Sequence, residues 1–136
     1  MSSSFRIFDI AGSAMSAQSV RLSTVASNLA NADAVGSDPA TVFKAHLPMF
    51  KTAPEVAGAQ TPGVRVTGVV EDQTPAEKRY EPGSPLADGE GFVYAPNVNV
   101  VEQMVDMISA SRSYQNNVEV MNTAKELALK TLTLGN

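Results

Sequence analysis

Apolar residues recur every seven positions near the start of the chain. The repeat has a line of large residues and, three positions later, a line of mostly small ones: Phe8, Met15, Leu22 and Leu29, then Ala11, Gln18, Val25 and Ala32. Two lines with this offset are the a and d positions of a helix that packs on a partner helix. We expect this helix to close near Asn31 and Asp33, before Gly36 and Pro39.

A second seven-residue repeat begins after Pro96. Its members are Val100, Met107, Tyr114, Met121 and Ala128. Four positions later come Met104, Ser111, Val118 and Leu132, with Lys125 as the polar interruption, while Val101, Val105 and Ile108 widen the first half. Asn99 suits the N-cap, and Glu102 stands at the reciprocal position of a capping box. The pattern predicts a helix of about 35 residues, roughly 50 Å long, that ends before Gly135.

The middle of the chain is rich in residues that break helices. All eight prolines lie between Pro39 and Pro96, and seven of the nine glycines lie between Gly36 and Gly91. Strand candidates separated by turn residues are Val42 to Phe50, Val64 to Val70, the region of Tyr80, and Phe92 to Tyr94. The sequence therefore predicts a mainly α fold with a small β insert.

Three segments follow from this division: an N-terminal helix in residues 1–35, a β-rich insert in 36–96 and a C-terminal helix in 97–136. We expect the two helices to pack as a coiled-coil-like pair and to form one assembly domain. Two helices alone bury little apolar surface, because each keeps an uncovered side. We therefore expect other molecules to cover what remains.

Composition narrows the possible functions. The 136 residues carry a net charge of −4, and the ten Lys and Arg residues are scattered, so nucleic-acid binding is not expected. The chain has no cysteine, which excludes disulfides and thiolate metal sites. Apolar runs fall short of the ~20 residues that span a bilayer. A cleaved signal peptide is not expected, because no basic region precedes an apolar run near Met1.

The candidates for catalytic or metal chemistry are few. His46 is the single histidine, so we interpret it as a structural residue rather than a zinc ligand. The run from Asp88 to Gly91 has two acidic residues but lacks the length of a calcium loop, which favours a tight turn. Glu71 and Asp72 are adjacent, so on an extended chain their carboxylates point to opposite faces. We predict no catalytic, cofactor or metal site.

Specific runs carry a family resemblance. The run from Ser27 to Asp33, with Asn-Leu-Ala-Asn at 28–31, resembles the N-terminal signature of flagellar rod and hook proteins. Residues 80–108, 110–118 and 122–130 are similar to a proximal-rod member of that family. Together these runs cover more than half of the chain. Ser84 and Leu86 depart from the histidine or acidic residues common there, and Asn99 replaces the usual Asp.

The resemblance implies a structural subunit of the bacterial flagellar basal-body rod. Neighbouring terminal helices would form a tubular wall around the export channel, with the β insert outside. The partners would be copies of the chain, other rod proteins and the type III export apparatus, without nucleic acid, small-molecule substrate or direct lipid binding. The subunit would assemble in the periplasm after export without a cleaved signal.

The resemblance and the two repeats together select the expected subunit contacts. They are Phe8, Met15, Leu22, Asn28, Leu29 and Asn31 in the first helix, and Val101, Met104, Met107, Ile108, Tyr114, Val118 and Met121 in the second. We expect Asn28 and Asn31 also to bond to backbone where the helix exits into the insert.

Other functions stay open at this stage. The chain could be a different flagellar rod or hook-type subunit. It could also be a peripheral membrane-surface protein, although such helices carry Lys or Arg along their polar face, and residues 1–35 have two Arg and two Asp. An enzyme or a small-ligand binder is a third possibility.

Overall fold

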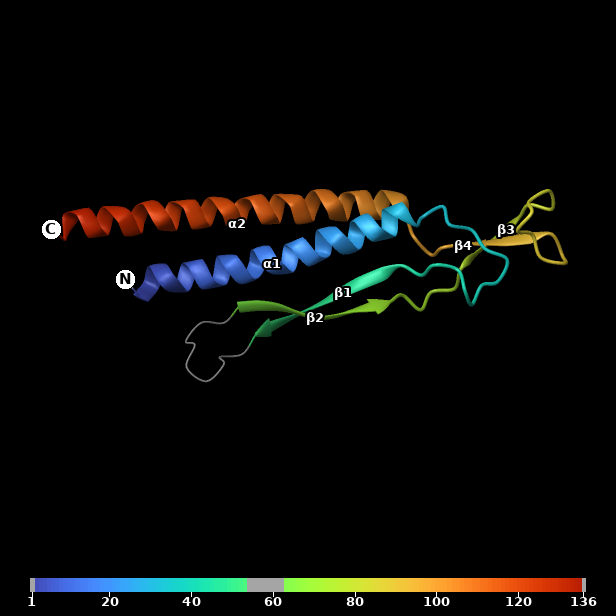
Figure 1. Cartoon of the computed structure of the whole chain (residues 1–136), viewed down its shortest axis with the longest axis horizontal. Coiled ribbons are helices and arrows are strands. Elements are labelled where there is room, and N and C mark those ends of the chain that lie inside the picture. Colours follow the sequence, from blue (N-terminus) through green and yellow to red (C-terminus); the bar gives the residue numbers. More distant parts are fainter. Residues whose placement is uncertain (1, 54–62, 136) are drawn as a thin grey trace.

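The computed structural model describes residues 2–53 and 63–135. Along the sequence, four strands lie between two long helices. The elements are α1 (Ser2–Ala30), β1 (His46–Ala53), β2 (Gly63–Glu71), β3 (Glu77–Tyr80), β4 (Phe92–Ala95) and α2 (Val100–Leu134). This architecture confirms the prediction of a mainly α fold with a small β insert (Figure 1).

The two helices lie side by side and run in opposite directions, so the start of α1 and the end of α2 share one end of the molecule (Figure 1). The predicted cap is confirmed, because the Asn99 side chain accepts a hydrogen bond from the Glu102 backbone N–H. At the other end, the Gly135 N–H donates to the Thr131 carbonyl. In the described part of the chain, no helix combines the length and apolar character needed to cross a membrane.

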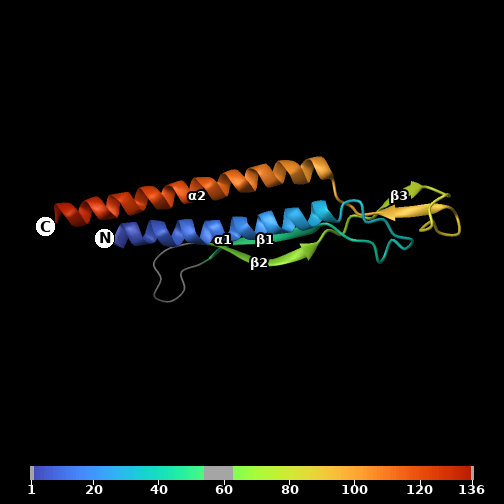
Figure 2. The ribbon, with the colours of Figure 1, turned by 45° about the horizontal axis from the view of Figure 1, so that its top comes forward.

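Strands β1 and β2 form an antiparallel pair that lies along α1, on the side away from α2 (Figure 2). The first strand starts later than the sequence predicts. The N–H groups of Thr41 and Val42 both bond to the Asp38 carbonyl, and this turn keeps them out of the strand. Pro48 does not interrupt β1, because a two-stranded sheet has open edges where no backbone N–H is needed.

Strands β3 and β4 form a second antiparallel pair that extends beyond the helices (Figure 1). It is tied to the exit of α1 by two backbone hydrogen bonds between Gly36 and Tyr94, each 2.9 Å long. The turn between the strands needs glycine at position 91, where φ is +85° and a Cβ would lie 3.0 Å from a ring carbon of Tyr80.

The buried core is thin and made of small residues. The predicted positions Ala11 and Val25 in α1, and Ala32 just after it, are buried, but so are Ala17 and Thr24, which the seven-residue pattern does not include. Helix α1 contacts both α2 and the β1–β2 pair, so it is covered on two sides. The sequence pattern indicated only one of these sides. The other side carries serine, threonine and alanine, which a sequence pattern does not distinguish from a solvent-exposed face.

Candidate assembly interface

The side of α2 that packs on α1 is lined by small and polar residues. Gln103, Ala110 and Ala124 are the buried residues of this helix. They lie three positions after Val100, Met107 and Met121, whereas the sequence pattern placed the second packing line four positions after them. The difference arises because a packed helix pair accepts small side chains, which allow the backbones to approach closely, in place of large apolar ones.

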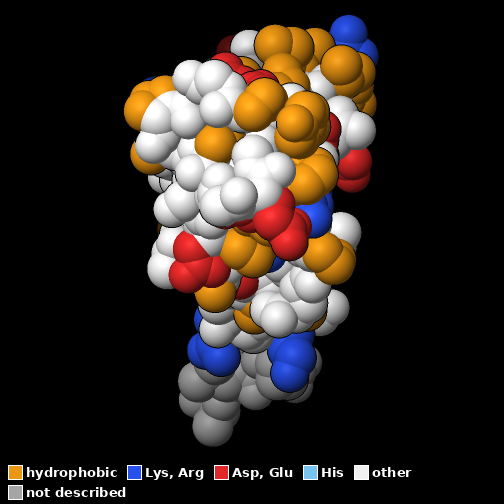
Figure 3. Space-filling model, turned by 90° about the vertical axis from the view of Figure 1, so that its right-hand side faces the viewer, with side chains coloured by type: hydrophobic (Ala, Val, Ile, Leu, Met, Phe, Trp, Pro, Cys, Tyr) orange, Lys and Arg blue, Asp and Glu red, His pale blue; other side chains and the backbone are white. Residues whose placement is uncertain are grey.

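The large apolar residues at the start of α2 instead point outward. Val101 is 71% exposed and Val105 is 61% exposed, and Met104 and Ile108 are exposed as well. Their spacing of three and four residues places them on one face of the helix. We call these four residues the α2 stripe. Figure 3 views the molecule from the end at which the β3–β4 pair lies, and apolar side chains are exposed over the upper part of this view.

A second apolar surface lies at the opposite end of the helix pair. Here the start of α1 and the end of α2 form an open groove of about 420 Å³. It is lined by Ile7, Asn116, Glu119, Val120, Thr123, Ala124 and Leu127. We call it the terminal groove. Val120 and Leu127 are exposed within it, so this surface is also uncovered in the single chain.

The predicted contact residues fall into three groups by exposure. Val101, Met104 and Ile108 are exposed. The half-buried group is Phe8, Met15, Leu22, Leu29, Asn31, Met107, Tyr114, Val118 and Met121. Asn28 is buried, with 1% of its surface exposed. The exposed group is free to meet a neighbour, whereas Asn28 acts inside the subunit.

Asn28 joins three elements. Its Nδ2 donates to the His46 carbonyl at 2.9 Å and to Gln103 Oε1 at 3.0 Å, and its Oδ1 accepts from the His46 N–H at 2.9 Å. One side chain of α1 is thus bonded to the start of β1 and to the first turn of α2. Asn31 acts more locally, because its Nδ2 donates to the Ser27 carbonyl within the last turn of α1.

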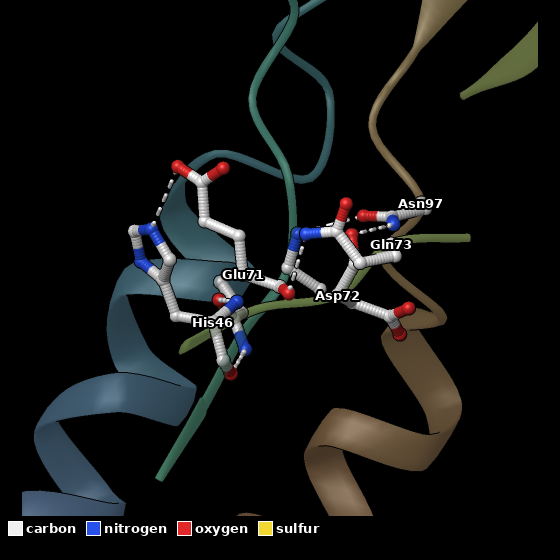
Figure 4. A network of polar contacts seen from close by, with 7 residues as sticks. His46, Glu71, Asp72, Gln73 and Asn97 are labelled. Carbon is white, nitrogen blue, oxygen red and sulfur yellow. Dashed lines mark hydrogen bonds and ion pairs between the residues drawn. The ribbon is translucent and has the colours of Figure 1, made fainter. Parts of the chain in front are cut away.

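Asn97 forms a second junction, which the sequence analysis did not single out. Its Oδ1 accepts from the Ala45 N–H at 2.7 Å, and its Nδ2 donates to the carbonyls of Asp72 and Thr74 (Figure 4). These bonds fix the chain before α2 against the ends of β1 and β2. The sequence did offer one indication of this role. Asn97 lies between Pro96 and the N-cap residue Asn99, at a position where neither helix capping nor a turn requires an asparagine.

An ion pair adds to these contacts between the helices. Arg21 donates to Asp106 Oδ1 at 2.9 Å, and both side chains are partly exposed. A pair of this kind contributes at most about 1 kcal/mol, so it orients the helices more than it stabilises them.

The candidates for chemistry have structural environments. His46 packs its ring edge against Phe43 and lies 3.9 Å from Glu71 Oε1, while Asp72 points away (Figure 4). The hydroxyl and N–H of Thr74 bond to the Asp72 carboxyl and hold its pKa below the ordinary value. Within the described ranges, no three His, Cys, Asp or Glu residues form a metal-binding cluster.

The Asp88 carboxylate closes the β3–β4 turn. Its Oδ1 accepts from the N–H groups of Phe92 and Glu90, and its Oδ2 accepts from the Tyr94 hydroxyl. These bonds, with the one from Phe92 first in importance, hold the pKa of Asp88 below its ordinary value of 3.8. The carboxylate is thus occupied by the turn, as the sequence predicted in preference to a calcium loop.

Family comparisons cover both helices. Residues 8–36 match the family described as flagella basal body rod protein. Residues 90–134 match the family described as flagellar basal body rod FlgEFG protein C-terminal. The first match contains the signature at 28–31, and the second contains the whole of α2.

Similar proteins extend the match to nearly the full length. The flagellar basal-body rod protein FlgC of Escherichia coli O6:H1 is 56% identical over 95% of this chain and 96% of its own length. That of Salmonella typhimurium is 54% identical over the same shares. That of Buchnera aphidicola from Acyrthosiphon pisum is 41% identical over 94% of this chain and 95% of its own. With such identity across helices and insert alike, the chain belongs to the FlgC family of flagellar basal-body rod proteins.

Proposed function

We propose that this protein is a rod subunit that assembles through the outward surfaces of its two terminal helices. The packed helix pair contributes to the wall of a tube around the export channel, and the strands lie outside it. The chain is a structural protein, and no step of this function requires a cofactor.

The observation that carries the proposal is the distribution of side chains around α2, which is the reverse of that in an ordinary surface helix. Its small and polar residues face α1, and its large apolar residues at 101, 104, 105 and 108 face solvent. A folded monomer gains nothing from this arrangement, because exposed apolar clusters favour association with other molecules. The arrangement is stable when neighbouring subunits cover the α2 stripe.

Membership of the family supports an inference about partners and location. We infer that the neighbours are copies of the chain and other flagellar rod proteins. We infer that the rod lies in the periplasm and that the chain arrives through the flagellar type III export apparatus without a cleaved signal. The relatives are named as basal-body rod proteins, which favours a rod subunit over a hook-type one.

The charges near the α2 stripe argue against a lipid surface as its partner. Glu102 lies within the same turns, and Arg112 is the first basic residue of the helix. Helices that lie on anionic membranes carry several Lys or Arg residues beside their apolar face. A protein surface fits this stripe better.

The test is the substitution Ile108→Glu, with Lys125→Gln as the control at an exposed position on another face of the same helix. Loss of a buried Ile contact costs about 1.5–3 kcal/mol, and an unpaired buried carboxylate costs more. We expect Ile108→Glu cells to make and export the protein but to lack rods and motility. Lys125→Gln cells should swim.

The readouts are swimming assays, electron microscopy of basal bodies and detection of the protein in the periplasm. Normal rods and motility in the Ile108→Glu strain would refute the proposal. Absence of the protein from the periplasm would indicate an export defect, and Val101→Glu would then serve as the second variant.

A further inference from the structure

The two uncovered apolar surfaces lie at different positions along the molecule and consist of different residues. The α2 stripe lies near the beginning of α2, where Val105 and Ile108 border an open hollow together with Arg112, and the terminal groove lies near its end. A contact between two different patches is heterologous, and repetition of it builds an open helical polymer rather than a closed pair. Each copy carries both halves of such a contact.

We propose that the α2 stripe of one copy docks in the terminal groove of a second copy, with the two α2 helices parallel. This inference rests on the proposed function and specifies its contact. Val105 at the centre of the stripe would lie level with Val120 in the groove. These positions are fifteen residues apart in the sequence, so adjacent copies would be displaced by ~22 Å along the helix axis.

Charge supports the parallel direction. Arg112 follows the stripe, and within the described residues it has no ion-pair partner in its own chain. In the parallel arrangement Arg112 lies level with Leu127, beside the exposed Glu126. In an antiparallel arrangement it lies level with Ser113, away from Glu126. The parallel direction therefore brings Arg112 near a carboxylate that is adjacent in sequence to Leu127 of the groove.

Polar character in the groove also fits a helix as its occupant. Asn116, Glu119 and Thr123 lie among the apolar lining residues. An apolar face laid in a groove with a polar rim is the common mode of helix recognition. A second copy supplies such a face without any further protein.

The experiment uses disulfide cross-linking, for which the chain has no native cysteine to interfere. The variant Val105→Cys/Val120→Cys is produced as the sole copy of the protein in cells, and isolated basal bodies are oxidised gently. The two positions on one helix lie ~22 Å apart, beyond the ~7 Å that a disulfide allows, so a bond must join two copies.

We expect the double variant to shift into covalent dimers and higher multimers on a denaturing gel. Val105→Cys alone, Val120→Cys alone and the control pair Val105→Cys/Gln115→Cys should stay monomeric. Dimers from a single variant would show a symmetric contact and overturn the inference. Cross-links to a different rod protein, identified by mass spectrometry, would overturn it as well.

Normal basal bodies without cross-links from the double variant would refute the docking while leaving the proposed function intact. If the double variant does not assemble, an exchange of charges between Arg112 and Glu126 tests the docking instead. Arg112→Glu should reduce rod assembly, and adding Glu126→Arg should restore it. Failure of the second change to restore assembly would overturn the proposed pairing.

Discussion

Single amide and carboxylate side chains hold together segments that are distant in the sequence. Asn28 reaches the start of β1, and Asn97 reaches the ends of both long strands. Each uses its amide donor and its carbonyl acceptor on backbone groups of another segment. A thin core of alanine and valine gives limited stabilisation, so these satisfied polar contacts decide the relative positions of the elements.

The Asp88 turn gives a prediction about pH. Hydrogen bonds to the carboxylate lower its pKa in the folded protein, so the stabilisation is present above the unfolded pKa and is lost as the pH falls below it. We expect the Asp88 carboxyl carbon, followed by NMR, to titrate with a midpoint below 3.8, the ordinary value. The Phe92 amide should shift over the same pH range.

The variant Asp88→Asn is the control for this titration, because it keeps the acceptor oxygen but cannot ionise. Its Phe92 amide should show no transition in this range. A midpoint for Asp88 at or above 3.8 would contradict the assignment of the carboxylate to the turn.

Helix α2 leaves large apolar residues exposed near both of its ends. Beyond the stripe, its last turns expose Leu127, Leu129, Leu132 and Leu134, the last of them by 87%. Isolated helices in water are marginal, and most of their stability comes from packing. The uncovered last turns of α2 should therefore be the least stable part of the helix.

This leads to a prediction for the isolated monomer. The structure has 29 residues in α1 and 35 in α2, about half of the chain. Circular dichroism of dilute protein should show clearly less helix than this, with the loss concentrated in the end of α2 and the start of α1. A fully helical monomer that melts cooperatively would contradict the dependence on neighbours.

On the scale of the whole molecule, Asn28 couples the helix pair to the strands. Asn28→Ala would leave the His46 N–H and carbonyl and Gln103 Oε1 without this partner. Leaving buried groups unpaired costs about 1–3 kcal/mol, so we expect a destabilisation of roughly that size. The loss should loosen β1 and the first turns of α2 together.

Asn31→Ala is the matched control for Asn28→Ala. The side chain of Asn31 bonds within α1 alone, so its loss should cost less than about 1 kcal/mol and leave β1 unaffected. Urea unfolding, followed by NMR signals of β1 and of α2, measures both variants. Equal effects of the two substitutions would show that Asn28 does not couple the elements.

The sequence alone determined the elements and their order. Periodicity requires no knowledge of partners, so the repeats from Phe8 to Leu29 and from Val100 to Ala128 were sufficient to place two long helices. Prolines and glycines confined the strands to the middle. The cap at Asn99 and the turn at Asp88 were also predictable, because each uses contacts between residues close in sequence.

Only the tertiary structure decided which faces are covered. The pattern could not show that α1 is buried on two sides, because Ala17 and Thr24 have no large apolar side chain to mark a core position. Nor could it show that Gln103 and Ala110 face inward while Val101 and Ile108 face outward. Burial depends on which element lies opposite, and in this protein the most apolar face of α2 has no such element within the described chain, whereas small residues allow the close approach of α1.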